Sequence, residues 1–431
     1  MKRRLIPIFV VAAATVAAFA VAATVLDRGR AQAPRVPIKL ATSASGLVLQ
    51  AQDRLRQAPN DVRALATLAS ASLERFRETG DPSWYAKTQE AADRALALRP
   101  DDVDALDAKA SLANSRHRFA DGVGLARRSM ALAPDRFAPL GIAADALIEL
   151  GRYDEGFALV DRRLALRPDG ASYSRASYAA ELHGDRALAI ELMSFAVDAT
   201  RTGSESRAWT RVELGKLYLG SGDVAVAGRQ MRRALIERPD DARALAGLGQ
   251  VLAARGRLDD AAKRYNRALE LTPLPDYAAA LHEIDQARGE TQRAADDLEL
   301  LGAMQRLLTA NGARIDLERS LIDADLGRTG SAAIARAREA RALRPGILGD
   351  DALGWTLTRA GRCAEGLRAA RASLRLGTRD ARLLFHAGAA ARCAGARADA
   401  ARYLRKALEL NPQFSVRWAP VAKRMLAEVT A

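Results

Sequence analysis

Short apolar stretches recur along the chain, and five of them end in a proline at a fixed interval. They read ALALRP, SMALAP, RLALRP, ALIERP and ALELTP, and they end at Pro100, Pro134, Pro168, Pro239 and Pro273. The first three prolines stand 34 residues apart, and the last two repeat that spacing. A 34-residue period of two short amphipathic helices is typical of a helical solenoid, in which each repeat packs on its neighbours. The pattern therefore predicts an all-α chain.

Small and apolar positions repeat in a fixed order within residues 208–273. One period contains Leu214-Gly215, Tyr218, Gly222-Asp223, Ala227, Ala234 and Pro239, and the next contains Leu248-Gly249, Gly256, Ala261, Tyr265, Ala268 and Pro273. This order closely resembles the tetratricopeptide repeat (TPR) family. The resemblance implies helix–turn–helix units wound into a right-handed superhelical solenoid. Small residues let the two helices of a unit touch, and a glycine ends the first helix in a left-handed cap.

The same ladder divides most of the chain into segments. Residues 47–412 are expected to form a solenoid of about ten units that begins with a partial unit ending at Pro59, and residues 413–431 a C-terminal capping helix. Residues 27–46 are interpreted as a linker because prolines and small polar residues gather there. The boundaries inside 169–205 and 274–311 stay open because the pattern is degenerate in both stretches.

A 22-residue apolar run, Leu5 to Leu26, follows Lys2-Arg3-Arg4 and predicts one N-terminal transmembrane or signal helix. At about 1.5 Å per residue it reaches roughly 33 Å, enough for a hydrocarbon core of about 30 Å. Two alternatives stay open for residues 1–26. Their length favours an uncleaved signal anchor, whereas small-x-small sites such as Ala18-Phe19-Ala20 allow a cleaved signal peptide. Either way we expect the repeats on the extracytoplasmic side of a bacterial cell, in the periplasm or at the cell surface, membrane-anchored or secreted.

The formal charge of +14 is unevenly distributed. Residues 346–431 hold 15 Lys and Arg against 7 Asp and Glu, which gives +8. A basic C-terminal end favours an acidic partner or anionic lipid headgroups, and a solvated arginine-rich face is the simpler alternative. Because no basic helix is interleaved with stacking aromatics, a nucleic-acid partner is not expected.

The sequence lacks the residue patterns of enzymes and metal sites. His117, His183, His282 and His386 do not pair at metal-ligand spacing, and no phosphate-binding loop or nucleophile elbow occurs. We therefore expect no catalytic residue, metal, cofactor or small-molecule substrate, and interpret the histidines as surface or inter-helix residues.

The two cysteines stand beside the turns of consecutive units. Cys363 follows Gly361 at the start of a second helix, and Cys393 precedes Gly395 at the end of the next first helix. Antiparallel packing of those helices would place both cysteines on the same side. They would form a disulfide in an oxidising compartment, and two free, half-buried thiols are the alternative.

TPR proteins commonly bind partners in a concave groove lined by the first helices. Carried over position by position, the resemblance assigns nine residues to that groove: Trp209, Val212, Lys216, Arg243, Gln250, Trp355, Arg359, Phe385 and Arg392. Trp and Arg are typical of interaction hot spots, although packing between repeats is the simpler explanation for both tryptophans. Val212, Lys216, Ala246 and Gln250 depart from the Lys and Asn pattern by which some relatives hold a C-terminal carboxylate, so that clamp is not expected.

Together these features predict a non-enzymatic scaffold that presents a concave groove to a protein or peptide partner outside the cytoplasm. The alternative is an accessory subunit of an envelope enzyme or assembly complex, of the polysaccharide-export or cytochrome-maturation type. That alternative is an analogy at the level of the fold.

Overall fold

The computed structural model describes residues 43–431. The predicted signal helix, residues 1–26, and most of the predicted linker lie outside the described residues. The described part is all-α, with twenty-two helices and no strand. Helix α2 (Ala44–Gln57) begins directly after its cap, Ser43, so the last three residues of the predicted linker are helical. Between residues 43 and 431 no helix is both long and apolar enough to cross a membrane.

The chain forms two compact units, which we call the small unit (described residues 43–147 and 306–314) and the large unit (residues 148–305 and 315–431). The small unit contains α2, α3 (Val62–Thr79), α4 (Ser83–Leu98), α5 (Val103–Ser115) and α6 (Phe119–Leu132). The large unit contains α8 (Tyr153–Leu166), α9 (Gly170–Leu182), α10 (Arg186–Asp198), α11 (Glu205–Gly220), α12 (Val224–Glu237), α13 (Ala242–Ala254), α14 (Leu258–Leu271), α15 (Pro275–Arg288), α17 (Asp316–Asp325), α18 (Ser331–Leu343), α19 (Ile347–Arg359), α20 (Cys363–Ser373), α21 (Ala381–Cys393), α22 (Arg397–Leu410) and α23 (Trp418–Thr430). Helices α7 (Ala138–Glu149) and α16 (Thr291–Ala310) each continue from one unit into the other.

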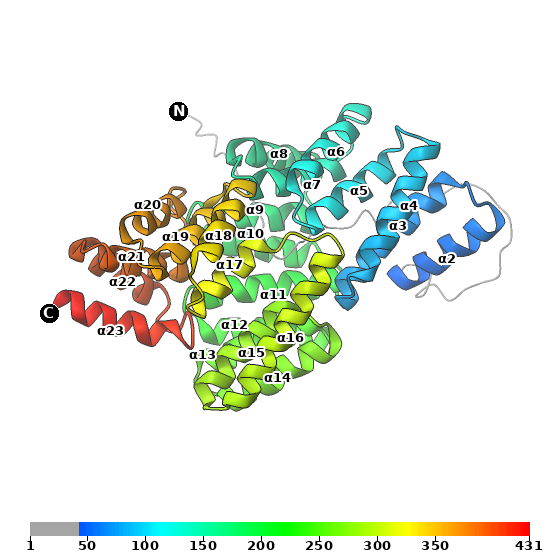
Figure 1. Ribbon diagram of the computed structural model, residues 1–431. Coiled ribbons are helices and arrows are strands. Elements are labelled where there is room, and N and C mark those ends of the chain that lie inside the picture. The colour runs from blue at the N-terminus through cyan, green and yellow to red at the C-terminus, as the bar shows by residue number, and fades with distance from the viewer. Residues whose placement is uncertain (1–42) are drawn as a thin grey trace, which may run out of the picture. The chain divides into compact units, whose positions relative to one another are not determined.

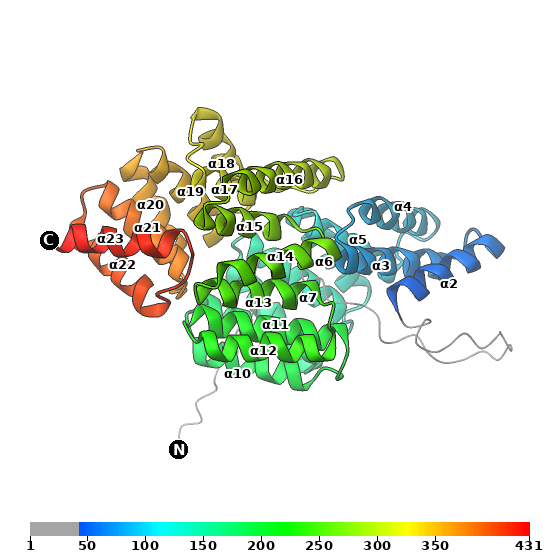
Figure 2. The same ribbon diagram turned by 90° about the horizontal axis from the view of Figure 1, so that it is seen from below.

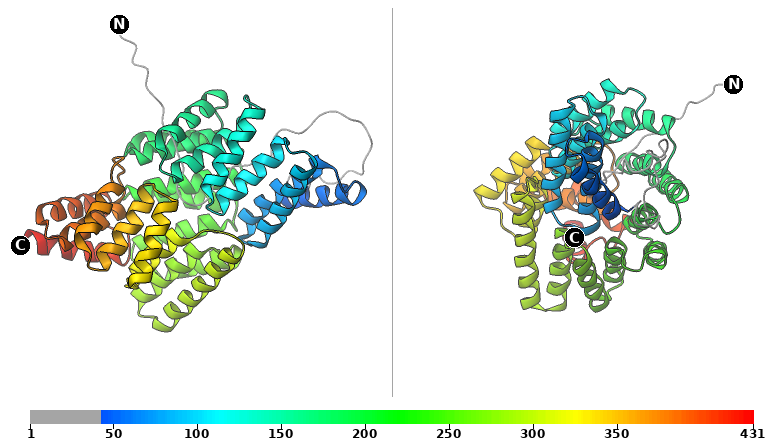
Figure 3. Two further views of the ribbon diagram at one scale, coloured as in Figure 1. Left: turned by 45° about the horizontal axis from the view of Figure 1, so that its top comes forward. Right: turned by 90° about the vertical axis from the view of Figure 1, so that its right-hand side faces the viewer.

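Within each unit, consecutive helices pair as antiparallel hairpins that stack in chain order (Figure 1). Figure 2 shows this stacking for α12, α13 and α14 in the large unit. In residues 43–431 ten helix pairs, α3–α4 to α21–α22, stand between the single helices α2 and α23. The C-terminal stack of α20 to α23 is clearest in the left panel of Figure 3.

Aspartates placed after the prolines start several first helices. The carboxylates of Asp61, Asp102 and Asp241 accept hydrogen bonds from the backbone N–H three residues later, at 3.1, 3.0 and 3.0 Å. Each carboxylate satisfies one of the donors that a helix start leaves unpaired, and its charge suits the helix dipole. The sequence pattern of proline followed by aspartate therefore sets where one hairpin ends and the next begins.

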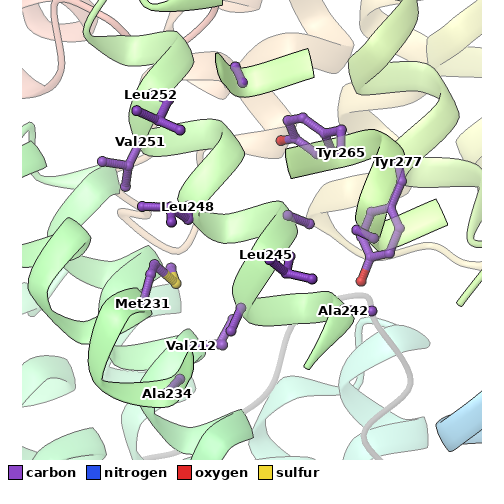
Figure 4. Packing of buried hydrophobic residues seen from close by; sticks show 14 of the residues in the cluster. Val212, Met231, Ala234, Ala242, Leu245, Leu248, Val251, Leu252, Tyr265 and Tyr277 are labelled. Atoms are coloured by element: carbon purple, nitrogen blue, oxygen red, sulfur yellow. The ribbon is translucent and has the colours of Figure 1, made fainter. Parts of the chain in front are cut away.

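Glycines let the helices of the two hairpins with the clearest repeat pattern approach closely around Met231, whose side chain is fully buried (Figure 4). A Cβ atom at Gly215 would lie 2.6 Å from Cε of Met231, and one at Gly247 would lie 2.7 Å from the same atom. In the next hairpin, a Cβ at Gly249 would lie 2.8 Å from the ring of Tyr265. A larger residue would displace these buried side chains, which explains the predicted small positions.

A second kind of contact joins helices that are far apart in the chain. In the large unit, the Tyr153 hydroxyl accepts a hydrogen bond from the Ile347 N–H at 2.7 Å. The Thr378 hydroxyl donates to the Leu182 carbonyl at 2.5 Å, and the Asn411 amide donates to the Leu219 carbonyl at 2.9 Å. Each of these contacts brings the turn inside one hairpin against the loop that follows a much later hairpin. We call this series of contacts the seam.

The seam has a constant register. Its three hydrogen bonds join residues 194, 196 and 192 positions apart, and in each case eleven helices separate the turn from the loop. The small unit contains a contact of the same kind, because the Arg314 N–H donates to the Arg116 carbonyl at 2.9 Å. The loop between hairpins therefore returns to an earlier turn after a fixed number of helices.

The seam places backbone against the turn glycines. Gly151 has a φ of +69°, and a Cβ there would lie 2.6 Å from the Pro345 carbonyl oxygen. Gly256 has a φ of +73°, but nothing among the described residues lies within 4 Å of a Cβ at that position. Glycine is thus favoured by conformation alone at Gly256, and by both conformation and close approach at Gly151.

Candidate protein-binding surface

Four of the nine residues predicted to face a groove are buried. The exposed fractions are 9% for Trp209, 0% for Val212, 1% for Trp355 and 0% for Phe385. The sequence expectation of exposure is not met at these positions, because each first helix is enclosed by its own second helix and by the neighbouring hairpins. For both tryptophans, packing between repeats describes their position in this structure.

Trp355 lies at the centre of an aromatic cluster formed by α19, α21 and α23. Its ring stacks on His386 with 4.3 Å between centroids and meets Trp418 edge to face at 5.3 Å. Its indole N–H donates to a carboxylate oxygen of Asp325 at 2.8 Å. The polar atom is therefore satisfied and the ring is fully packed, an arrangement that stabilises the C-terminal hairpins.

The other five predicted residues keep accessible surface: Lys216, Gln250, Arg359 and Arg392 are exposed, and Arg243 is half-buried. Lys216 pairs with Glu213 at 2.8 Å, and Arg392 pairs with Glu428 at 2.6 Å. Because surface ion pairs of this kind contribute about 0–1 kcal/mol, a partner can replace them at little cost.

Lys216 and Gln250 belong to a regular line of polar side chains. Each stands six residues before the turn glycine of its hairpin, and Glu283 occupies the equivalent place in the next one. These three residues come from α11, α13 and α15 in consecutive hairpins of the large unit. We call Lys216, Gln250 and Glu283 the polar row. Sequence reasoning missed Glu283, although its distance from the turn glycine would have identified it.

The polar row ends near charges from the C-terminal hairpins of the large unit. Burial raises the pKa of Glu283 and Asp325 adds to that effect, whereas Arg382 and Arg417 lower it. Arg382 itself pairs with Asp325 at 2.7 Å. Helix α15 therefore shares an electrostatic environment with α21 and with the residue that precedes α23.

A second carboxylate near the row has an altered pKa. Burial raises the pKa of Glu181 to about 7, and Asp380 and Glu213 contribute to the rise, whereas Arg186 and Lys216 oppose it. Glu181 is half-buried, and it lies one residue before Leu182, which takes part in the seam. Protonation of Glu181 is thus coupled to Lys216 and Glu213 in α11, and to Asp380, which lies close in sequence to the seam residue Thr378.

Cys363 and Cys393 are joined by a disulfide, with their Cα atoms 5.2 Å apart. Cys363 is the first residue of α20 and Cys393 the last residue of α21, so the bridge ties the turns of two consecutive hairpins together.

The histidines occupy ordinary positions in the packing. His282 and His386 are buried between helices, where the Nδ1 atom of His282 lies 2.7 Å from the Ala294 carbonyl and that of His386 lies 2.9 Å from an Asp351 oxygen. Across residues 43–431, His, Cys, Asp and Glu side chains do not gather in any group of three or more that could hold a metal ion.

Comparison with known proteins identifies the repeat type. Residues 212–274 match the family described as tetratricopeptide repeat. No curated protein matches the chain in sequence.

Several solved structures are similar in arrangement at low identity. A human IFIT1 dimer with PPP-AAAA is 14% identical, with a TM-score of 0.48, and the match covers 85% of this chain and 90% of that one. The Cut9–Hcn1 hetero-tetramer of the APC/C is 16% identical, with a TM-score of 0.37 and coverages of 90% and 76%. Yeast Tom70 is 13% identical, with a TM-score of 0.36 and coverages of 90% and 95%. The family match covers two hairpins, α11–α12 from Val212 and α13–α14, and it identifies these residues of the all-α chain as similar to tetratricopeptide repeats.

Proposed function

We propose that the protein is a non-enzymatic scaffold that binds another protein or a peptide through the polar row of its large unit. Tetratricopeptide repeats generally serve protein–protein interaction. The observation that carries the proposal is the repetition of Lys216, Gln250 and Glu283 at one position of three consecutive hairpins. An extended segment running across the hairpins would meet one polar side chain per repeat.

The partner is proposed to carry acidic groups. Arg405 and Lys406 on α22, and Lys423 and Arg424 on α23, are exposed, and they belong to the C-terminal stretch with a formal charge of +8. Exposed cations of one sign steer an acidic partner toward this end of the large unit and raise its rate of association.

The apolar run from Leu5 to Leu26 supports a location outside the cytoplasm, with the N-terminal helix either retained as a membrane anchor or removed. Mass spectrometry of the mature N-terminus, from membrane and soluble fractions, distinguishes these two forms. The location would be contradicted if an added protease degraded residues 43–431 only after the inner membrane had been permeabilised.

A role as accessory subunit of an envelope assembly complex is the second candidate, and the same long N-terminal run favours it. It predicts recovery with one complex at a fixed stoichiometry, whereas a general scaffold is recovered with several partners at variable ratios.

Proximity labelling in the native host tests the binding surface. The variant Lys216→Glu reverses a charge in the polar row, and Lys263→Glu is its matched control. Both lysines pair with a carboxylate three residues earlier, but Lys263 lies on the second helix α14. We expect Lys216→Glu to lose the labelled partner and Lys263→Glu to keep it. Equal labelling by both variants would remove the polar row as the binding surface.

A further inference from the structure

The turns of the large unit differ in what lies against them. The turns at Gly151, Gly184 and Gly222 lie under the seam, where the backbone of residues 345, 377 and 410 approaches them. The turns at Gly361 and Gly395 have no described atom within 4 Å of a Cβ at either glycine. These two uncovered turns belong to hairpins α19–α20 and α21–α22.

The disulfide stands at the two uncovered turns. Cys363 follows Gly361 by two residues, and Cys393 precedes Gly395 by two residues. The bridge therefore fixes the spacing of adjacent turns at an edge that has no seam contact. Hydrogen bonds and close backbone packing of the seam hold the turns at Gly151, Gly184 and Gly222. The turns at Gly256 and Gly289 are uncovered as well, but no disulfide joins them.

We propose that the Cys363–Cys393 disulfide is a redox-sensitive latch that holds together the turn ends of hairpins α19–α20 and α21–α22, where the seam makes no contact. A dithiol reductant opens the latch by supplying two electrons and two protons. The S–S bond breaks, two thiols form, and the reductant becomes a cyclic disulfide. A disulfide oxidant reverses the step. Opening the latch loosens the turn ends of the last two hairpins and leaves the hairpins whose turns lie under the seam unchanged.

The packing around the latch explains why the loosening stays local. Each hairpin of a solenoid packs mainly on its neighbours, so a lost restraint acts on the adjacent hairpins. The Trp355 cluster joins α19 and α21 to α23, and the ion pair between Arg392 and Glu428 joins α21 to α23. These contacts therefore weaken together when the two turns are free to separate.

Hydrogen–deuterium exchange on the full-length protein, purified without reductant, tests the latch. We expect dithiothreitol to accelerate exchange at least tenfold in residues 363–430. In α9 to α14 we expect exchange to change less than twofold. The double variant Cys363→Ser/Cys393→Ser is expected to match the reduced protein and to show no response to dithiothreitol.

Three results would overturn the latch. Titration that finds two free thiols in the unreduced, denatured protein removes the bridge. Equal exchange rates in oxidised and reduced protein show that the bridge restrains nothing. Acceleration spread evenly over the large unit shows that the disulfide stabilises the whole unit and does not act as a local latch. Because the wild-type comparison needs no substitution, the test stands even if the double variant does not fold.

Discussion

Replacing Gly151 by alanine measures how much the seam affects stability. Gly256→Ala is its matched control. The two glycines have φ values of +69° and +73°, so that alanine meets the same left-handed strain of roughly 1–2 kcal/mol at either position. They differ in what the new Cβ meets. At Gly151 it would lie 2.6 Å from the Pro345 oxygen and 3.1 Å from the Gly346 Cα, whereas at Gly256 nothing described lies within 4 Å.

The magnitude follows from that difference. Both neighbours of Gly151 are backbone atoms, which cannot rotate away as a side chain would, so the loop must shift. Overpacking of this kind costs about 1–3 kcal/mol. We therefore expect Gly256→Ala to destabilise the protein by about 1–2 kcal/mol, and Gly151→Ala by about 2–5 kcal/mol. The excess is the cost of displacing the loop at this seam contact.

Urea unfolding followed by circular dichroism gives the overall loss, and hydrogen exchange locates it. Gly151→Ala should expose amides on both sides of the seam, in α8 and in α19, although these helices are far apart in the sequence. Gly256→Ala should affect only α13 and α14. If the free energies of unfolding of the two variants agree within about 0.5 kcal/mol and neither variant changes exchange in α19, the seam contributes nothing to stability.

Three further predictions use other parts of the large unit. Trp355→Ala should cost about 3–5 kcal/mol in chemical denaturation, and Trp355→Phe about 1–2 kcal/mol for the lost hydrogen bond to Asp325; a loss below 1 kcal/mol for the alanine variant would mean that the ring is not packed. The pKa of Glu181 is raised to about 7 from its usual 4.5, so wild-type stability should be greatest below pH 4.5 with respect to this group and fall as the pH rises through 7. Glu181→Gln should remove that decline and gain about 1–2 kcal/mol at pH 8, once solvent screening of a half-exposed carboxylate is allowed for, with no gain at pH 4; parallel pH profiles of wild type and variant would contradict this. Thr378→Val should accelerate exchange near Leu182 as well as near residue 378, because its hydroxyl bonds to the Leu182 carbonyl, and the replacement Ser should restore protection; an effect near residue 378 alone would separate this bond from the seam.

Much of the local fold could be predicted from the sequence because it depends on short-range chemistry. The prolines and following aspartates mark where hairpins meet, and Asp61, Asp102 and Asp241 do cap first helices. The glycine positions 215 and 249 likewise reflect contacts within one hairpin. Such signals survive in a single sequence because neighbouring residues meet regardless of how the whole chain winds.

The exposure of the candidate binding residues was harder to predict for a physical reason. Periodicity places Trp355 and Lys216 at the same position relative to the turn glycine, yet one is 1% exposed and the other is exposed. What decides is the neighbouring helix: His386 and Trp418 cover Trp355, whereas the matching contacts are absent at Lys216 within the described residues. The seam was unpredictable for a similar reason, because it depends on the rotation accumulated over eleven helices, including those in the degenerate stretches.

The fixed register of the seam limits how this protein can change in length. Open repeat arrays gain or lose whole repeats during evolution, since every junction resembles the next. Here a hairpin inserted between residues 219 and 347 would carry every later loop past its matching turn, and would separate Ile347 from Tyr153, Thr378 from Leu182 and Asn411 from Leu219 together. Duplication should therefore be tolerated only at the ends of the array, and engineered chimaeras should exchange hairpins one for one.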